Sequence, residues 1–329
     1  MSNPGFRLPD RPLREDGEMR RAGLEIEFNG LKIETAAEVL AEALDATLER
    51  RTAVDFRLSS EALGTFRLEL DWAYLKARAE AASIGEESPE WVDLLKRMSA
   101  DIVPLELVCP PIALDRLDAL EPAVDALRRA GGRGTGDSFL AAFGVHINPE
   151  LPSLEAGDIE RYIRSFALLQ WWLVDRRGVD LARRLSPYVD LYPEAYVLGL
   201  ARAGGQPDLA RLIDTYLAHN ATRNRALDML PLFKELDAPR LEGRIDDDEL
   251  VNARPTFHYR LPDCRLEESG WSLATAWQSW LLIEDLAMAH ALLNALSAEF
   301  AARHRPVLGV SRSDWTHHVD RCLTDHGLA

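Results

Sequence analysis

Cysteine is scarce in this sequence, which limits both the covalent cross-links and the metal chemistry open to it. Among 329 residues there are three cysteines, Cys109, Cys264 and Cys322, an odd number at wide spacing. This usage is typical of proteins that fold without structural disulfides in a reducing compartment. The sequence therefore predicts a cytoplasmic protein and disfavours a cysteine-based zinc site.

Long apolar runs and an excess of positive charge are also missing. The longest apolar stretch, residues 166–174, is far shorter than the roughly 20 residues that cross a bilayer. Lys and Arg total 38 against 54 Asp and Glu, which argues against nucleic acid or an anionic membrane as the main partner. Residues 1–22 are polar, carry three prolines and have no apolar centre, so we expect a flexible N-terminal arm rather than a secretory signal.

Several familiar catalytic motifs do not occur. The glycine-rich segment GGRGTGD, residues 131–137, lacks the Gly-Lys-Ser/Thr ending of a P-loop. It is interpreted as a connection between a helix and a strand, with a phosphate-covering lid as the alternative. Gly-x-Ser-x-Gly, His-Glu-x-x-His and Cys-x-x-Cys are absent as well. The His317-His318 pair has no third ligand nearby in the sequence and is interpreted as a solvated helix end.

What is present is an alternation of short strand patterns and helical patterns, followed by a helical C-terminal part. Residues 23–34, 65–71, 102–108 and 139–148 have the alternating period of strands or hairpins, and helical patterns separate them. Beyond residue 149 the helical stretches are 154–174, 207–218, 224–236 and 273–302, with one strand-like piece at 255–261. No linker divides the chain. The sequence predicts one α+β domain over residues 23–329.

Polar side chains recur on these strands in a pattern that suggests a metal and nucleotide site. Residues two apart share one face of a strand. The pairs and single residues concerned are Glu25 with Glu27, Glu69 with Asp71, Glu106 alone, His146 with Asn148, and His258 with Arg260. Carboxylates with an occasional imidazole or amide are ligands that suit Mg²⁺ or Mn²⁺.

The plainer interpretation is that these residues lie on solvated strand faces. Asp and Glu fill 54 of 329 positions, so an acid-x-acid pair is expected by chance about nine times in such a chain. Solvated faces normally mix Lys, Thr and Arg with acids, however, whereas these acids stand among apolar neighbours. Like charges so placed repel one another unless a cation neutralises them. Taken together, the strand pairs favour a cation site.

The motifs GLEIEF, FRLELD, PLELVCPP and FGVHIN, followed by TFHYRLPD, resemble in order the successive strand motifs of the amidoligase family. That family is related to glutamate-cysteine ligase and glutamine synthetase. The resemblance implies a curved, mainly antiparallel sheet shaped as a half-funnel, with a helical C-terminal portion. It also implies ATP and Mg²⁺, with Mn²⁺ as an alternative ion, as cofactors of an amide-forming ligase that works through an acyl phosphate.

The resemblance assigns roles to residues of this chain. The implied metal ligands are Glu25, Glu27, Glu69, Glu106, His146 and His258. The implied nucleotide-binding residues are Glu69, Asp71, Asn148 and Arg183, and the implied catalytic residues are Arg260, Arg184 and Glu27. Two positions depart from the family pattern, because Asn148 stands where a His is common and His258 where a Glu is usual. An imidazole carries no negative charge and favours Mn²⁺ over Mg²⁺ relative to a carboxylate.

Two other functions stay open at this point. A nucleotide-binding regulatory protein that has lost the transfer reaction is one, and His258 motivates it. A different metal-dependent enzyme, such as a phosphotransferase or an amide hydrolase, is the other. For the leading function, the expected partners are a small carboxylic acid and an amine, such as an amino acid, peptide or polyamine. The sequence leaves both substrates and the oligomeric state undetermined.

Overall fold

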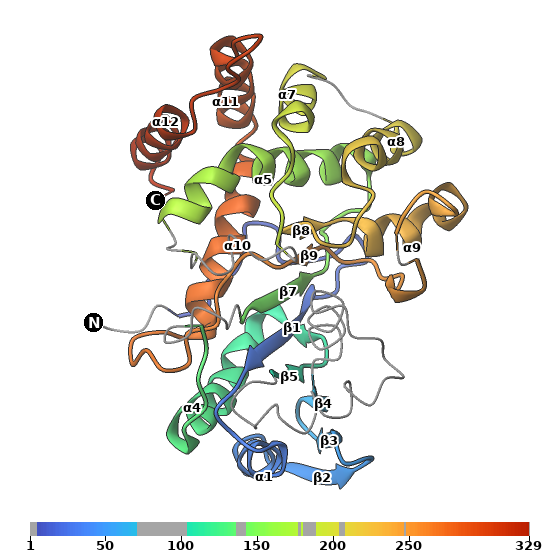
Figure 1. The fold of residues 1–329 in the computed structure, drawn as a ribbon, viewed down its shortest axis with the longest axis vertical. Coiled ribbons are helices and arrows are strands. Elements are labelled where there is room, and N and C mark those ends of the chain that lie inside the picture. The colour runs from blue at the N-terminus through green and yellow to red at the C-terminus, as the bar shows by residue number, and fades with distance from the viewer. Residues whose placement is uncertain are drawn as a thin grey trace, which may run out of the picture.

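The computed structural model describes residues 5–70, 104–135, 143–176, 179, 189–203, 208–246 and 248–328. Within these ranges most strands of a large antiparallel sheet come from the N-terminal half of the chain, and most of the helices come from the C-terminal half (Figure 1). This confirms the predicted α+β class with a curved, mostly antiparallel sheet. Asp71, Arg183 and Arg184, as well as the helix expected near residue 90, lie outside the described residues.

The sheet has nine strands in the order β2-β3-β4-β5-β1-β7-β9-β8, with β6 paired to one end of β1. The strands are β1 (Arg21–Phe28), β2 (Ala46–Arg50), β3 (Asp55–Ser60), β4 (Gly64–Leu70), β5 (Leu105–Val108), β6 (Ile112–Ala113), β7 (Val145–Pro149), β8 (Leu227–Asp228) and β9 (His258–Tyr259). Every pairing among them is antiparallel. Strand β1 therefore lies near the centre, with β5 on one side and β7 on the other.

Alternation along β1 sorts its residues between the two faces of the sheet. Leu24, Ile26 and Phe28 are completely buried in the hydrophobic core. Glu25 and Glu27 point to the opposite face, as the GLEIEF pattern predicts. Gly30, with φ of +85°, then turns the chain into the first helix. Residues 23–28 thus lie in one strand, a turn follows, and the first helix begins at Ile33, so the hairpin alternative is wrong.

The helices and helical turns are α1 (Ile33–Ala43), η1 (Leu114–Leu120), α4 (Glu121–Ala130), α5 (Ala156–Arg176), α7 (Glu194–Ala203), α8 (Leu209–Asn220), α9 (Leu230–Leu241), η2 (Asp248–Leu250), α10 (Leu273–Met288), α11 (His290–Arg303) and α12 (Arg312–Asp325). Helix α5 packs against α10, α11 and α12, and α11 also packs against α7. Helices α5, α7, α11 and α12 lie beyond the β8 edge of the sheet, whereas α10 runs alongside the sheet and contacts β7 (Figure 1).

Two helix boundaries differ from those expected. The stretch 273–302 is divided at Ala289, whose ψ of 65° breaks the helix, and the two halves meet at an angle of 92°. The stretch expected to be helical from residue 224 begins as β8, and α9 starts only at Leu230. The Asp228 carboxylate accepts the Leu230 backbone N–H at 2.9 Å. Such a local side-chain hydrogen bond competes with continuation of a helix.

The N-terminal segment from residue 5 onward is packed against the domain, which differs from the expected free arm. Arg20 is fully buried and makes a two-point ion pair with Glu284 on α10, at 2.7 and 2.9 Å. Tyr162 and Trp280 donate to the same carboxylate. The Trp277 indole N–H donates to the Arg7 carbonyl oxygen at 2.9 Å. A buried guanidinium has to be paired in this way, so Arg20 anchors the segment to the core.

Among the described helices, none is by itself long and apolar enough to cross a membrane. Helices α10 and α11 meet the length and composition criteria only as a pair, across their 92° bend.

Candidate active site

The strand register places the predicted polar residues on one face of the sheet. Glu27 on β1 lies directly opposite Glu106 on β5, and Glu106 lies opposite Glu69 on β4. On the other side of β1, Glu25 lies opposite His146 on β7. Residues directly opposite in an antiparallel pair point to the same face. A row of carboxylates thus crosses β4, β5 and β1, and His146 on β7 extends this row of polar side chains.

The same face continues across β7, β9 and β8. Ile147 pairs with Tyr259, which places His258 and Arg260 on the face that His146 and Asn148 share. Asp228 on β8 pairs with His258. Residues from six strands therefore share this face, although some of them lie more than two hundred positions apart in the sequence.

His146 lies between two carboxylates. Its Nδ1 is 2.9 Å from Glu25 Oε2, and its Nε2 is 3.4 Å from Glu27 Oε1. Asn148 donates to the second oxygen of Glu25 at 3.0 Å, and the Gly144 backbone N–H donates to Glu27 at 2.6 Å. A neutral imidazole has one N–H and cannot satisfy both carboxylates. A metal ion between His146 Nε2 and Glu27 would therefore be stabilised.

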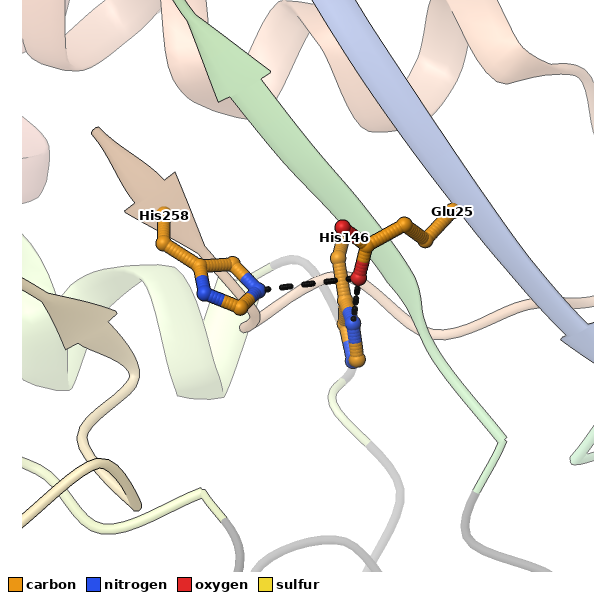
Figure 2. Close-up of side chains that lie close together, drawn as sticks. All are labelled: Glu25, His146 and His258. Carbon is orange, nitrogen blue, oxygen red and sulfur yellow. Dashed lines mark hydrogen bonds and ion pairs between the residues drawn. The ribbon is translucent and has the colours of Figure 1, made fainter. Parts of the chain in front are cut away.

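His258 faces the same Glu25 carboxylate from the other side, as Figure 2 shows. Its Nε2 is 3.7 Å from Glu25 Oε2, and its ring stands edge-on to that of His146 with centroids 5.4 Å apart. The His258 Nε2 atom is buried and has no hydrogen-bond partner. On the other edge of the ring, Nδ1 lies near two guanidinium groups, at 3.1 Å from Arg254 and 3.4 Å from Arg260.

The local environment shifts the pKa values of these groups in different directions. Burial raises the pKa of Glu25, but the hydrogen bond from His146 and the positive charge around the carboxylate, to which Arg254 contributes least, together hold this pKa well below its usual range. Burial lowers the pKa of His258 well below its usual range, and the Arg260 and Arg254 guanidinium groups add to the effect. Burial raises the pKa of Asp228 to about 6. Glu25 is thus ionised and His258 neutral near neutral pH.

Two groups of donor atoms within the described residues have the spacing of metal ligands. One consists of Glu25, His146 and His258, and the other of Glu27, Glu106 and His146. In each group one donor atom from each residue lies within 4.8 Å of the others. The second group brings two carboxylates and one imidazole together, which is a donor set that Mg²⁺ or Mn²⁺ accepts. The 3.4 Å separation of His146 Nε2 from Glu27 Oε1 is compatible with such an ion bound by both.

The structure does not bring every predicted residue into these groups. Glu69 is in line with Glu106 but is paired with Arg67 at 2.8 Å, and burial raises its pKa. It borders the donor groups without belonging to either. Asn148 is in neither group, but its amide donates a hydrogen bond to Glu25 and so helps to hold that carboxylate in place. Asp71, Arg183 and Arg184 lie outside the described residues, so their predicted roles stay predictions.

Two residues of the site were missed from the sequence. Arg254, in the segment before β9, reaches both Glu25, at 3.7 Å, and His258. Asp228 lies 3.8 Å from both His258 and Arg260. Arg254 is four positions before His258, outside the alternating strand pattern, and Asp228 belongs to a two-residue strand. Neither carries a periodic signal of the kind that identifies the longer strands.

A separate pocket of about 160 Å³ lies next to Tyr259, Leu261, Trp271 and Thr275. Tyr259 alternates with His258 and Arg260 along the chain and so faces away from them. This pocket is therefore distinct from the carboxylate and histidine groups.

Comparison with known proteins agrees with this geometry. No curated protein matches the chain. The family model described as "Putative amidoligase enzyme" matches residues 18–282, which is most of the chain and includes all the site residues above. The chain therefore belongs to this amidoligase family, and that membership supports an amide-bond ligase function in general.

Proposed function

We propose that the protein is an ATP-dependent carboxylate-amine ligase that forms an amide through an acyl phosphate. The observation that carries the proposal is the meeting of Glu27, Glu106 and His146 on one sheet face, in a chain of the amidoligase family. Two carboxylates and an imidazole whose donor atoms lie within 4.8 Å of one another suit a cation that accompanies a nucleotide.

Glu27, Glu106 and His146 are the residues that would hold Mg²⁺ or Mn²⁺. His146 donates through Nδ1 to Glu25 and turns Nε2 toward Glu27. A metal-binding histidine commonly donates its second ring N–H to a carboxylate in this manner, which fixes the tautomer. When bound, the divalent ion supplies neutralisation of phosphate charge. Glu25 then acts as the partner that orients His146, and Glu69 adds negative charge next to Glu106.

The reaction itself divides into two displacements. A carboxylate oxygen of the acid attacks the γ-phosphorus of ATP, the bond to the bridging oxygen breaks, and ADP leaves. The amine then attacks the carbonyl carbon of the acyl phosphate, loses a proton, and inorganic phosphate leaves with the C–O bonding pair. Arg260 directly follows β9 and lies on the same face as His146, and in the proposed reaction it would balance negative charge that develops during the first transfer. Arg183 and Arg184 remain candidates for the same task.

A regulatory protein that binds nucleotide without transfer is the second candidate function. The observation that favours it is the presence of His258, with a neutral ring, at a position where the family usually has a carboxylate. One negative charge fewer weakens any cation site that depends on this residue.

The experiment that separates these functions is a screen for ADP release. The full chain is supplied with ATP, Mg²⁺ or Mn²⁺, and a library of small acids and amines, and any new amide is identified by mass spectrometry. A ligase releases ADP in step with an amide when both an acid and an amine are present. A regulatory protein binds nucleotide and releases no ADP with any pair, whereas a hydrolase acts without ATP.

A further inference from the structure

The two guanidinium groups beside His258 determine which of its ring nitrogens carries the proton. Arg254 Nη2 and Arg260 Nη2 both approach Nδ1, at 3.1 and 3.4 Å. A guanidinium has only donors, so Nδ1 has to be the acceptor. The ring is buried beside two cations, which disfavours the imidazolium. In the neutral ring the proton is consequently on Nε2.

The other tautomer is opposed by the same contacts. A proton on Nδ1 would face two sets of guanidinium hydrogens. The nearest acceptor for it, Asp228 Oδ2, is 3.8 Å away, which is beyond hydrogen-bond distance. His146 is the opposite case, because its Nδ1 faces a carboxylate at 2.9 Å and keeps its proton there. The two histidines that flank Glu25 therefore present different chemistry: His146 offers a lone pair on Nε2, and His258 offers an N–H.

This tautomer removes His258 from the metal ligands. A nitrogen that carries a proton has no lone pair for a metal ion. The donor group of Glu25, His146 and His258 therefore loses one of its three members. The group of Glu27, Glu106 and His146 is unaffected.

Donors outnumber acceptors at the His258 end of the site. Arg223, Arg254 and Arg260 all act on Asp228, and Glu25 is the other carboxylate at this end. The opposite end holds Glu27, Glu106 and Glu69 with Arg67. Two buried donor atoms near His258, its own Nε2 and Arg254 Nε, have no hydrogen-bond partner. Leaving buried donors without acceptors destabilises a protein, so an anionic acceptor placed here is stabilised.

We propose that Arg254 and the Nε2–H of His258 bind the carboxylate of the acid substrate, and that His258 is a hydrogen-bond donor rather than a metal ligand. The inference rests on the proposed function only in taking the anion to be the acid substrate. The proposal places the acid next to Arg260, between β8 and the donor group of Glu27, Glu106 and His146. Substrate recognition then depends on Arg254, and charge neutralisation during transfer on Arg260.

The test uses nitrogen NMR on the full-length ¹⁵N-labelled protein without metal or nucleotide. Long-range ¹H–¹⁵N correlations report which nitrogen of each histidine is protonated. The His258 signals are those that vanish in His258→Gln, and they are identified independently by their displacement in Arg254→Met. We expect the Nε2–H pattern for His258 near neutral pH. The Nδ1–H pattern or a doubly protonated ring would overturn the inference.

Acetate serves as the carboxylate probe, with chloride at equal ionic strength as its control. We expect acetate to shift the His258 signals saturably, and Arg254→Met to weaken this binding by about tenfold or more, because a hydrogen bond to a charged group is lost. Arg50→Met, which removes an exposed arginine paired with Glu34, should leave acetate binding unchanged. Equal acetate affinity in the wild type and Arg254→Met, or an acetate response no larger than that of chloride, would overturn the assignment. Neither measurement requires turnover, so failure of the ligase proposal is seen separately in the ADP screen.

Discussion

Glu27 and Glu106 lie directly opposite each other on β1 and β5, and both side chains face His146. Two carboxylates at directly opposite positions repel each other, and a cation bound between them removes this repulsion by attracting both. A sheet normally avoids like charges at directly opposite positions. Their presence at opposite positions is explained if the pair holds an ion.

Glu27→Gln should remove most of the thermal stabilisation that ATP with a divalent ion confers. At a ligand concentration about 100-fold above its dissociation constant, binding stabilises the wild type by roughly 2.7 kcal/mol. The variant loses one charge from the cation site and keeps nearly the same shape. The matched control is Glu49→Gln. Glu49 lies on β2 in an exposed ion pair with Arg51, so this variant should respond like the wild type. An equal melting shift in Glu27→Gln would remove Glu27 from the ligands.

Arg260→Ala should lower turnover far more than it weakens ATP binding. Charge develops on the transferring group chiefly in the transition state, where a guanidinium contributes most. Arg260→Lys should recover only part of the rate, because lysine lacks the planar fork that engages two oxygens. Steady-state kinetics and nucleotide binding measured on the same preparations separate the two effects. A fully active Arg260→Ala enzyme would exclude Arg260 from the mechanism.

Asp228→Asn should change the pH dependence of stability. Burial raises the Asp228 pKa from 3.8 to about 6, so the folded state binds this proton more tightly than the unfolded state does. The free energy of unfolding therefore falls as pH rises between these values, by roughly 3 kcal/mol in total from this group. Glu25, whose pKa is lowered, gives the opposite slope in both proteins. Denaturant titrations across this range should show the variant gaining stability relative to the wild type. Parallel pH profiles would contradict the assignment.

Arg20→Met should destabilise the protein by roughly 3–5 kcal/mol, because the buried Glu284 carboxylate loses its counter-charge. Adding Glu284→Gln should recover part of this loss by removing the stranded charge. The exposed arginine change Arg50→Met should have little effect. Urea unfolding measures all four proteins. If Arg20→Met behaved like Arg50→Met, Arg20 would not anchor the N-terminal segment.

The sequence predicted the parts of the site that depend on local alternation. Glu25 and Glu27 share a face because they are two apart in a strand, and the same rule placed His146 with Asn148 and His258 with Arg260. The register that sets Glu27 opposite Glu106 depends on long-range pairing, which local alternation does not predict. Arg254 and Asp228 were missed because a loop and a two-residue strand carry no period. The packed N-terminal segment was missed because polar composition does not show that Arg20 finds a buried partner.

The tautomer of His258 could not be predicted from the sequence either. The residue was predicted as a metal ligand from its position in TFHYRLPD, and its two arginine neighbours argue for the other role. Arg260 could be anticipated as a neighbour on the same strand face, whereas the contact with Arg254 depends on how the preceding loop folds back.

The central claim is that Glu27, Glu106 and His146 hold the divalent ion, and pulsed electron paramagnetic resonance of bound Mn²⁺ tests it most directly. This measurement detects a coordinated imidazole nitrogen through its coupling to the metal. We predict coupling to a single imidazole nitrogen in the wild type, lost in His146→Gln and retained in His258→Gln. A bound Mn²⁺ without nitrogen coupling, or a coupling that persists in His146→Gln and disappears in His258→Gln, would contradict it.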